Sequence, residues 1–176
     1  MKHEEEKAMN SNTTIKKIKI IESTGKNEID CIRRGEQGED EVKGLFAEQA
    51  APEFYEAMKA LTVPGANILE APELAARLVP FAVTYHYDKD DTMGAIITMK
   101  LKLPESKTET VINTPMRKCA KSDNPKGAVL TATAARVLWN LEAEARKYLI
   151  GKRAQKSLFE DVDMPKDEPE AIPQVV

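Results

Sequence analysis

The chain has 176 residues, of which 41% are hydrophobic and 31% are charged, and its formal net charge is −3. This length suits one domain that buries a core without disulfides or metals, and no apolar run approaches the ~20 residues that span a bilayer. Because the charged residues 1–7 lack the apolar segment of a signal peptide, we expect a cytoplasmic protein.

The charge is unevenly distributed along the chain. Between Glu160 and Val176 there are six acidic residues and one lysine, so the part before them is mildly basic. That balance is compatible with nucleic-acid contact but does not demand it. We expect a disordered arm over residues 1–14, one folded domain over 15–151 and a flexible segment over 152–176.

The first half of the domain predicts a hairpin followed by helices. Residues 15–21 are rich in isoleucine and predict a strand, residues 25–27 a turn, and residues 28–34 a returning strand. The polar, glycine-rich stretch 35–44 is interpreted as a loop. Pro52 opens a helix that Pro64 and Gly65 should end, and a short helix is expected over 72–77.

The centre gives the clearest strand signal. Phe81, Val83, Tyr85 and Tyr87 alternate with polar or small residues, and after a bend at 88–92 a second alternating run continues from Ala95. Period-2 alternation predicts an antiparallel hairpin with one apolar face, and a further strand is expected over 108–113.

A long helix closes the domain. Its apolar stripe has helical spacing, and a glycine that suits a C-terminal cap follows it; these residues are Leu130, Ala134, Val137, Leu138, Leu141, Ala145, Tyr148, Leu149 and Gly151. The predicted fold is α+β: an antiparallel sheet of about four to five strands, with a short helix and the long C-terminal helix packed on one face.

The residue types that perform catalysis or bind metals show no matching pattern. His86 falls on a strand, and Cys31 and Cys119 lack ligand or redox spacing; two free thiols are expected, with a bridge between them as the alternative. The aspartates of the 88–92 bend suit a solvated turn better than a Mg²⁺ site. We therefore expect no enzyme activity, no catalytic residue, no metal and no cofactor.

Four lysines form a candidate surface for nucleic acid. Lys17 and Lys19 on one strand, and Lys100 and Lys102 on another, would share a solvent-facing side of the sheet and follow a phosphate backbone. Tyr85 and Tyr87, the aromatic residues that could stack on bases, have core-side parity instead. A solvated lysine face is the simpler interpretation.

A five-residue peptide near the C-terminal end is the most specific feature. It reads Gln-Lys-Ser-Leu-Phe over 155–159, and it resembles the Gln-x-Ser/Asp-Leu-Phe peptide that bacterial replication proteins insert into the sliding clamp. The resemblance implies that Gln155 bonds in a polar pocket, Ser157 supports the turn, and Leu158 and Phe159 fill an apolar cleft. The alternative is that Leu158 and Phe159 fold back onto the domain.

The body also resembles a family of small uncharacterised proteins encoded by phages and prophages of Gram-positive gut bacteria, found among replication and recombination genes. The matching runs lie between residues 15 and 159, at 15–21, 52–57, 93–95, 113–115 and 147–155, continuing into Leu158 and Phe159. This resemblance implies a lineage and a host-cell cytoplasmic setting, and no chemistry.

Three functions follow as expectations. The first is a non-enzymatic phage accessory protein of DNA replication or recombination, which docks on the host sliding clamp through residues 155–159. The second is a phage inhibitor of a bacterial defence or nuclease system that acts by occlusion. The third is a single-stranded DNA-binding module that uses the four lysines.

Overall fold

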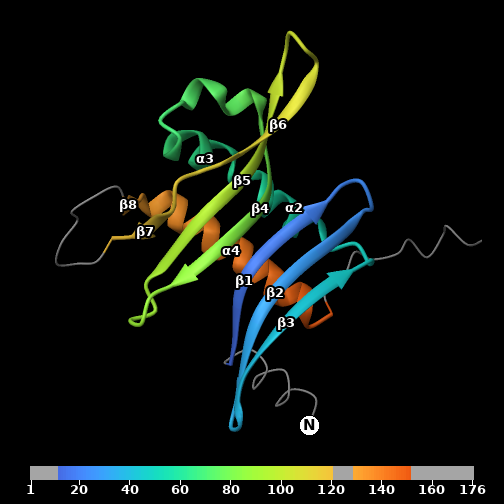
Figure 1. The fold of residues 1–176 in the computed structure, drawn as a ribbon, viewed down its shortest axis with the longest axis vertical. Coiled ribbons are helices and arrows are strands. Elements are labelled where there is room, and N and C mark those ends of the chain that lie inside the picture. The colour runs from blue at the N-terminus through green and yellow to red at the C-terminus, as the bar shows by residue number, and fades with distance from the viewer. Residues whose placement is uncertain (1–11, 121–128, 152–176) are drawn as a thin grey trace, which may run out of the picture.

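The computed structural model describes residues 12–120 and 129–151, which form one mostly antiparallel sheet with helices against one of its faces (Figure 1). The sheet has eight strands in the order β3-β2-β1-β4-β5-β7-β8, and β6 pairs with β5 outside this path. The α+β prediction is confirmed. The expectation of four to five strands is wrong, because one polar strand and two very short strands escaped the sequence patterns.

The first three strands form a meander: β1 (Thr13–Ile21), β2 (Lys26–Gly35) and β3 (Gly38–Phe46). β1 begins two residues before the expected start. The loop expected over 35–44 is wrong, because β3 pairs with β2 through nine residue pairs. β3 lies at the edge of the sheet and carries Glu39, Asp40 and Glu41. Acidic residues have low strand propensity, but charge on an edge strand discourages pairing with other chains.

Two helices and a 3-10 turn connect the meander to the central strands: α2 (Pro52–Lys59), α3 (Thr62–Ile68) and η1 (Pro72–Arg77). Pro52 begins α2 as predicted. The expected stop at Pro64 and Gly65 is wrong, because both residues lie inside α3 and are buried. Pro64 is in the first turn, where no helical acceptor exists for its missing N–H.

The predicted central hairpin is confirmed as β4 (Leu78–Tyr87) and β5 (Met93–Leu103). Val83 and Tyr85 are fully buried as expected, but Phe81 is not. The register between β4 and β5 shifts between Pro80 and Ala82, so Phe81 is the extra residue of a β-bulge. Because the side-chain period of a strand is 2, one extra residue moves Phe81 off the core face.

The chain then adds β6 (Thr108–Asn113), β7 (Arg117–Cys119), β8 (Val129–Leu130) and α4 (Ala132–Leu149). The strand over 108–113 and the long helix are confirmed, although Leu130 lies in β8 and not in the helix. The Thr131 side chain caps α4 by accepting from the Ala134 N–H at 3.1 Å. Gly151 follows the helix with φ of 106°, as a C-terminal cap requires.

The core lies between the sheet and the helices α2 and α4. Phe46 of β3, Phe54 of α2 and Tyr148 of α4 form an aromatic cluster with ring centroids 5.3 and 5.7 Å apart. Tyr85 of β4 is fully buried and donates a 2.8 Å hydrogen bond to the Leu138 carbonyl of α4. These contacts hold α4 in place at its middle and at its last turn.

Candidate functional site

The predicted docking peptide, Gln155 to Phe159, lies outside the described residues. What the structure does place is the end of α4, where Ile150 and Gly151 are exposed. Tyr148, one turn earlier, is buried and donates a hydrogen bond from its hydroxyl to the Glu48 carbonyl. The point from which the peptide departs is therefore held firmly on the surface of the domain.

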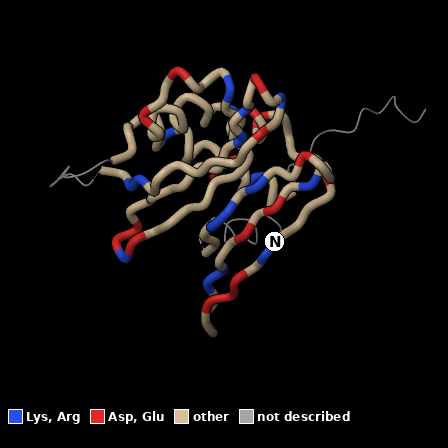
Figure 2. Tube along the Cα trace, turned by 45° about the horizontal axis from the view of Figure 1, so that its top comes forward, with Lys and Arg blue, Asp and Glu red and all other residues tan. Residues whose placement is uncertain are grey.

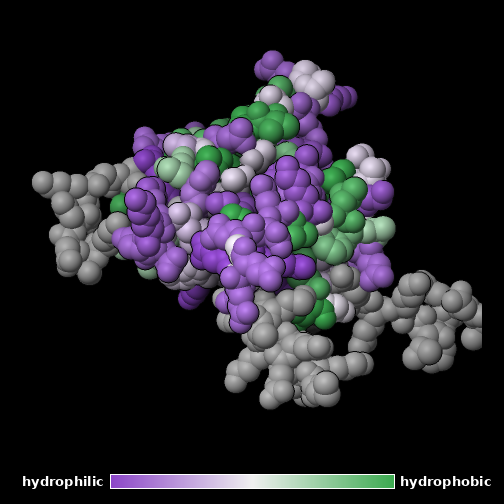
Figure 3. Space-filling model, turned by 60° about the horizontal axis from the view of Figure 1, so that its bottom comes forward, coloured by the Kyte–Doolittle hydropathy of each residue, from purple (hydrophilic) through white to green (hydrophobic). Residues whose placement is uncertain are grey.

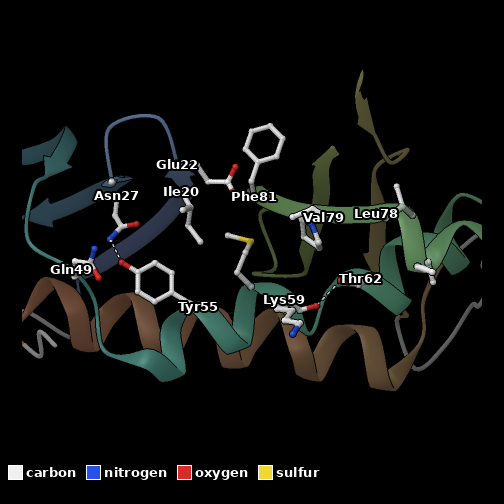
Figure 4. A pocket seen from close by; sticks show the side chains of 15 residues that line it. Ile20, Glu22, Asn27, Gln49, Tyr55, Lys59, Thr62, Leu78, Val79 and Phe81 are labelled. Atoms are coloured by element: carbon white, nitrogen blue, oxygen red, sulfur yellow. Dashed lines mark hydrogen bonds between the residues drawn. The ribbon is translucent and has the colours of Figure 1, made fainter. Parts of the chain in front are cut away.

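A cleft lies between β1 and β4 and is floored by α2 and η1 (Figure 4). It exists because β1 and β4 pair over only three positions, the last being Lys19 with Ala82. Beyond that pair, Phe81 occupies the bulge and Pro80 has no N–H to donate, so the pairing ends. The two strands separate there, and the space between them is left open.

The cleft has a volume of about 650 Å³ and a mainly apolar lining. Pockets of roughly 300–1,000 Å³ are typical of small-molecule sites. Asn27, Gln49 and Tyr55 lie at one end of it, and Leu78 and Val79 lie at the other (Figure 4). Its other lining residues are Ile20, Glu22, Gly25, Met58, Lys59, Thr62, Ala75, Ala76, Pro80 and Phe81.

A buried polar pair occupies one end of the cleft. The Asn27 side chain is 1% exposed and donates from Nδ2 to the Tyr55 hydroxyl at 3.1 Å. The same hydroxyl accepts from the Ala50 N–H at 3.2 Å. The Asn27 Oδ1 atom is buried and has no hydrogen-bond partner in the described residues. A buried amide oxygen without a donor is destabilising, so this end of the cleft lacks one hydrogen-bond donor.

The rim of the cleft carries charges that largely offset each other. Glu22 binds Lys100 at 2.5 Å, and the Lys100 ammonium lies 5.9 Å from the centre of the Phe81 ring. The hydrogen bond that Lys100 donates to Glu22 is the largest of the contacts that raise the pKa of Lys100, so this lysine stays charged. Lys59 adds a positive charge on the α2 side. The cleft is therefore an apolar space with a polar end and a rim on which Lys59 is the excess charge.

The four candidate lysines do lie on strands of the same sheet, but carboxylates accompany them. Lys17 binds Glu28 at 2.6 Å, and Lys100 is also 3.6 Å from Glu109. The bond from Lys17 is the main reason that the pKa of Glu28 is lowered. Figure 2 shows basic and acidic positions interspersed along these strands, not gathered into a basic stripe.

The two remaining lysines, Lys19 and Lys102, have no ion pair recorded within residues 12–120 and 129–151. The aromatic residues expected on the core side are found there, since Tyr85 is fully buried and Tyr87 donates to Glu142 of α4 at 3.0 Å. The described part of the sheet therefore does not form a continuous basic surface that also carries exposed aromatic residues for base stacking.

The other residues weighed for chemistry have structural partners. Asp88 binds Lys118 at 2.8 Å, and Asp90 accepts from the Thr92 N–H in the bend. His86 is exposed on β4. Cys31 and Cys119 are both free thiols, and burial raises the pKa of Cys119, which keeps it a poor nucleophile. Among the described residues, no cluster of His, Cys, Asp and Glu has the size needed to hold a metal ion.

The sequence did not single out Asn27 and Tyr55. The sequence places Asn27 in the turn expected over 25–27, and Tyr55 falls within the helix that Pro52 opens. They are 28 positions apart, and only the packing of α2 on the meander brings them together. No local sequence pattern predicts a contact between Asn27 and Tyr55.

Comparison of the chain with protein-family models, with curated proteins and with solved structures gave no match in any of the three. No helix in the described ranges is both long and apolar enough to cross a membrane. The space-filling view shows hydrophilic side chains over much of the visible face, with apolar ones in separate patches (Figure 3). Function must therefore be argued from the residues themselves.

Proposed function

We propose that this chain is a non-enzymatic accessory protein of DNA replication or recombination, of phage or prophage lineage, that docks on the host sliding clamp. The observation that carries the proposal is the Gln-Lys-Ser-Leu-Phe peptide over 155–159, which begins four residues after the cap of α4 at Gly151. The folded body makes a second contact, to DNA or to another replication protein.

The described end of α4 supports this arrangement. A docking peptide works best when it is tethered to a rigid body at a solvent-exposed point, because the tether raises its local concentration near a second contact. Tyr148 packs against Phe54 and Phe46 and bonds to the Glu48 carbonyl, which fixes the last turn of α4. Ile150 and Gly151 are exposed just beyond it.

The strength of docking follows from the size of the peptide. Leu158 and Phe159 supply two apolar anchors, and Gln155 supplies a donor and an acceptor at one end. Ordering the segment offsets much of the free energy of apolar burial, so we expect a dissociation constant of roughly 10⁻⁶ M.

The test is a titration of the full chain against immobilised host clamp. The double variant Leu158→Ala/Phe159→Ala should abolish binding, and Gln155→Ala should weaken it. Lys156→Ala, at the variable position of the motif, is the matched control and should bind like the parent chain. Thermal unfolding of all four proteins should be the same.

Two outcomes would contradict clamp docking and favour another role for the chain. If Leu158→Ala/Phe159→Ala lowers the unfolding temperature while the parent chain does not bind the clamp, the two residues serve the fold by folding back. If the chain captures a defence nuclease and inhibits it in a purified assay, without clamp binding, the inhibitor function takes its place.

A further inference from the structure

The clamp docking proposed above makes no use of the cleft between β1 and β4, whose residues lie far in sequence from the terminal peptide. We propose that this cleft binds a small, mostly apolar molecule that carries an amide or lactam group at one end. The inference rests on the shape of the cleft, on its apolar lining and on the buried Asn27–Tyr55 pair, and it does not depend on the function proposed above.

The first support is the way the cleft is kept open. The pairing of β1 with β4 ends at Lys19 and Ala82, and the bulge at Phe81 together with Pro80 prevents it from resuming. On the other side, η1 is tied to β5 because Arg77 Nε donates to the Lys102 carbonyl at 2.9 Å. The walls are therefore parts of the folded framework, and a pocket of this kind is pre-formed.

The second support is the chemistry of the polar end. The Tyr55 hydroxyl accepts two hydrogen bonds, from Asn27 Nδ2 and from the Ala50 N–H, and the described residues provide no acceptor for its own proton. Asn27 Oδ1 has no donor. One unused acceptor and one unused donor therefore lie next to each other, which is the complement of a group that both donates and accepts.

An amide or lactam supplies the required donor and the required acceptor in a single group. Its N–H donates to Asn27 Oδ1, and its carbonyl accepts from the Tyr55 O–H. An alcohol can also meet both atoms, but one oxygen must then donate and accept at the same place, whereas an amide puts the donor and the acceptor on two separate atoms. A charged ammonium has no acceptor and would be desolvated without a counter-charge. Asn27 is 1% exposed, so the ligand reaches Oδ1 only if the amide turns toward the cleft, and the rest of the ligand occupies the apolar part.

The apolar body of the ligand would contact the remaining walls. Ile20 of β1, Met58 of α2 and Leu78 of β4 line this part, and Ala75 of η1 leaves room because its side chain is small. Glu22 is bound to Lys100, so the rim keeps one excess positive charge, that of Lys59. The mainly apolar lining favours a neutral body in the cleft over a strongly charged one.

The experiment uses a matched pair of probes on the full chain. Naphthalene-2-carboxamide carries an apolar body with a donor and an acceptor, and its N,N-dimethyl derivative keeps the carbonyl but lacks the donor. Binding is followed by amide chemical shifts in ¹H–¹⁵N spectra, with the shifts expected at the cleft residues. We expect a dissociation constant of roughly 10⁻⁴ to 10⁻³ M for the carboxamide and about tenfold weaker binding of the dimethyl derivative.

Two variants separate recognition from folding. Asn27→Leu keeps a similar volume and removes the unpaired oxygen, so it should weaken the carboxamide about tenfold and abolish the preference between the two probes. Ala75→Phe should fill the cleft and remove binding of both probes. Ala143→Phe, the same change on an exposed position of α4, is the control and should leave binding unchanged.

Three outcomes would overturn the proposal. The first is that the carboxamide causes no shifts at the cleft residues at millimolar concentration. The second is that both probes bind equally to the parent chain. The third is that the Leu158→Ala/Phe159→Ala variant binds the carboxamide more tightly than the parent chain does, which would assign the cleft to the chain's own terminal peptide.

Discussion

The side chain of Asn27, at the start of β2, donates a 3.1 Å hydrogen bond to the hydroxyl of Tyr55, on α2. This bond joins the meander to the first helix at the polar end of the cleft. The Tyr55 hydroxyl also holds the Ala50 N–H, which belongs to the segment leading into α2. One tyrosine oxygen thus supports the helix entry and the wall of the cleft together.

We expect Tyr55→Phe to destabilise the fold, because the buried Ala50 N–H and the Asn27 amide both lose their partner. The loss should be about 2–3 kcal/mol of unfolding free energy, since each unsatisfied buried group costs roughly 1–3 kcal/mol. Urea unfolding of the variant at neutral pH measures it. A loss below about 0.5 kcal/mol would show that water replaces the hydroxyl at both groups.

A double-mutant cycle with Asn27→Leu isolates the pair. Asn27→Leu alone should leave stability unchanged or raise it, because it removes a buried amide with an unpaired oxygen. In the Tyr55→Phe/Asn27→Leu double variant, only the Ala50 N–H is left unsatisfied. The double variant should therefore be more stable than Tyr55→Phe alone, and strict additivity of the two changes would contradict the coupling.

The burial of Asp30 leads us to expect that the free energy of unfolding depends on pH. It is 9% exposed and lies in the sheet opposite Lys17 and Lys43, and its Oδ1 atom has no hydrogen-bond partner in the described residues. Burial, followed by the nearby Glu28, raises the pKa of Asp30. A carboxyl group with a raised pKa in the folded state favours folding when protonated, and that contribution is lost as the pH rises through the folded pKa.

We therefore expect Asp30→Asn to be more stable than the parent chain at pH 7. The advantage should disappear near pH 3, where the carboxyl group is protonated in both the folded and the unfolded state of the parent. Urea unfolding across this pH range measures the difference. Asp40→Asn on the exposed part of β3 is the control, and a constant difference across the range would contradict the raised pKa.

Gly65 predicts a steric requirement at the contact of α3 with the sheet. A Cβ atom at this position would lie 2.5 Å from the Sδ atom of Met99, which is fully buried on β5. Gly65→Ala should therefore cost about 1–3 kcal/mol of unfolding free energy. Gly35→Ala, where only one atom lies as near as 4.0 Å, should cost much less.

The contact between Gly65 and Met99 can also be tested by removing the Met99 side chain. Met99→Ala removes the obstructing side chain, so Gly65→Ala should cost less in that background than in the parent chain, as measured by thermal or urea unfolding. An equal cost in both backgrounds would show that Gly65 is needed for its backbone and not for the space beside Met99.

The lysine face predicts the response to salt in nucleic-acid binding. Four phosphate contacts to single-stranded DNA would give a slope of log affinity against log salt of about −2.8. Because Lys17 and Lys100 are already bound to Glu28 and Glu22, we expect a slope no steeper than about −1.5. Fluorescence anisotropy with an oligothymidine measures it.

Charge reversal tests the same surface. The double variant Lys100→Glu/Lys102→Glu should change affinity no more than Lys89→Glu in the exposed bend after β4. A steep slope that the double variant abolishes would instead support the single-stranded DNA-binding function.

The elements with local residue patterns could be predicted from the amino-acid sequence. The alternation in β4 and β5 and the apolar stripe of α4 are set by which face of each element is buried, so they can be detected within a short window. Pro52 at the start of α2 and Gly151 after α4 mark helix ends through their own backbone geometry. The clamp-like peptide is also a property of the sequence alone.

The features that depend on partners far apart in the chain could be seen only in the folded protein. β3 forms because all of its residues pair with β2, although the acidic residues of β3 have low strand propensity. Gly65 serves close contact with Met99, and not helix termination. The cleft arises where a bulge at Phe81 ends the pairing of β1 with β4, and the packing of α2 on the meander brings Tyr55 near Asn27. These outcomes are set by packing between segments far apart in the chain, which no local pattern of residues encodes.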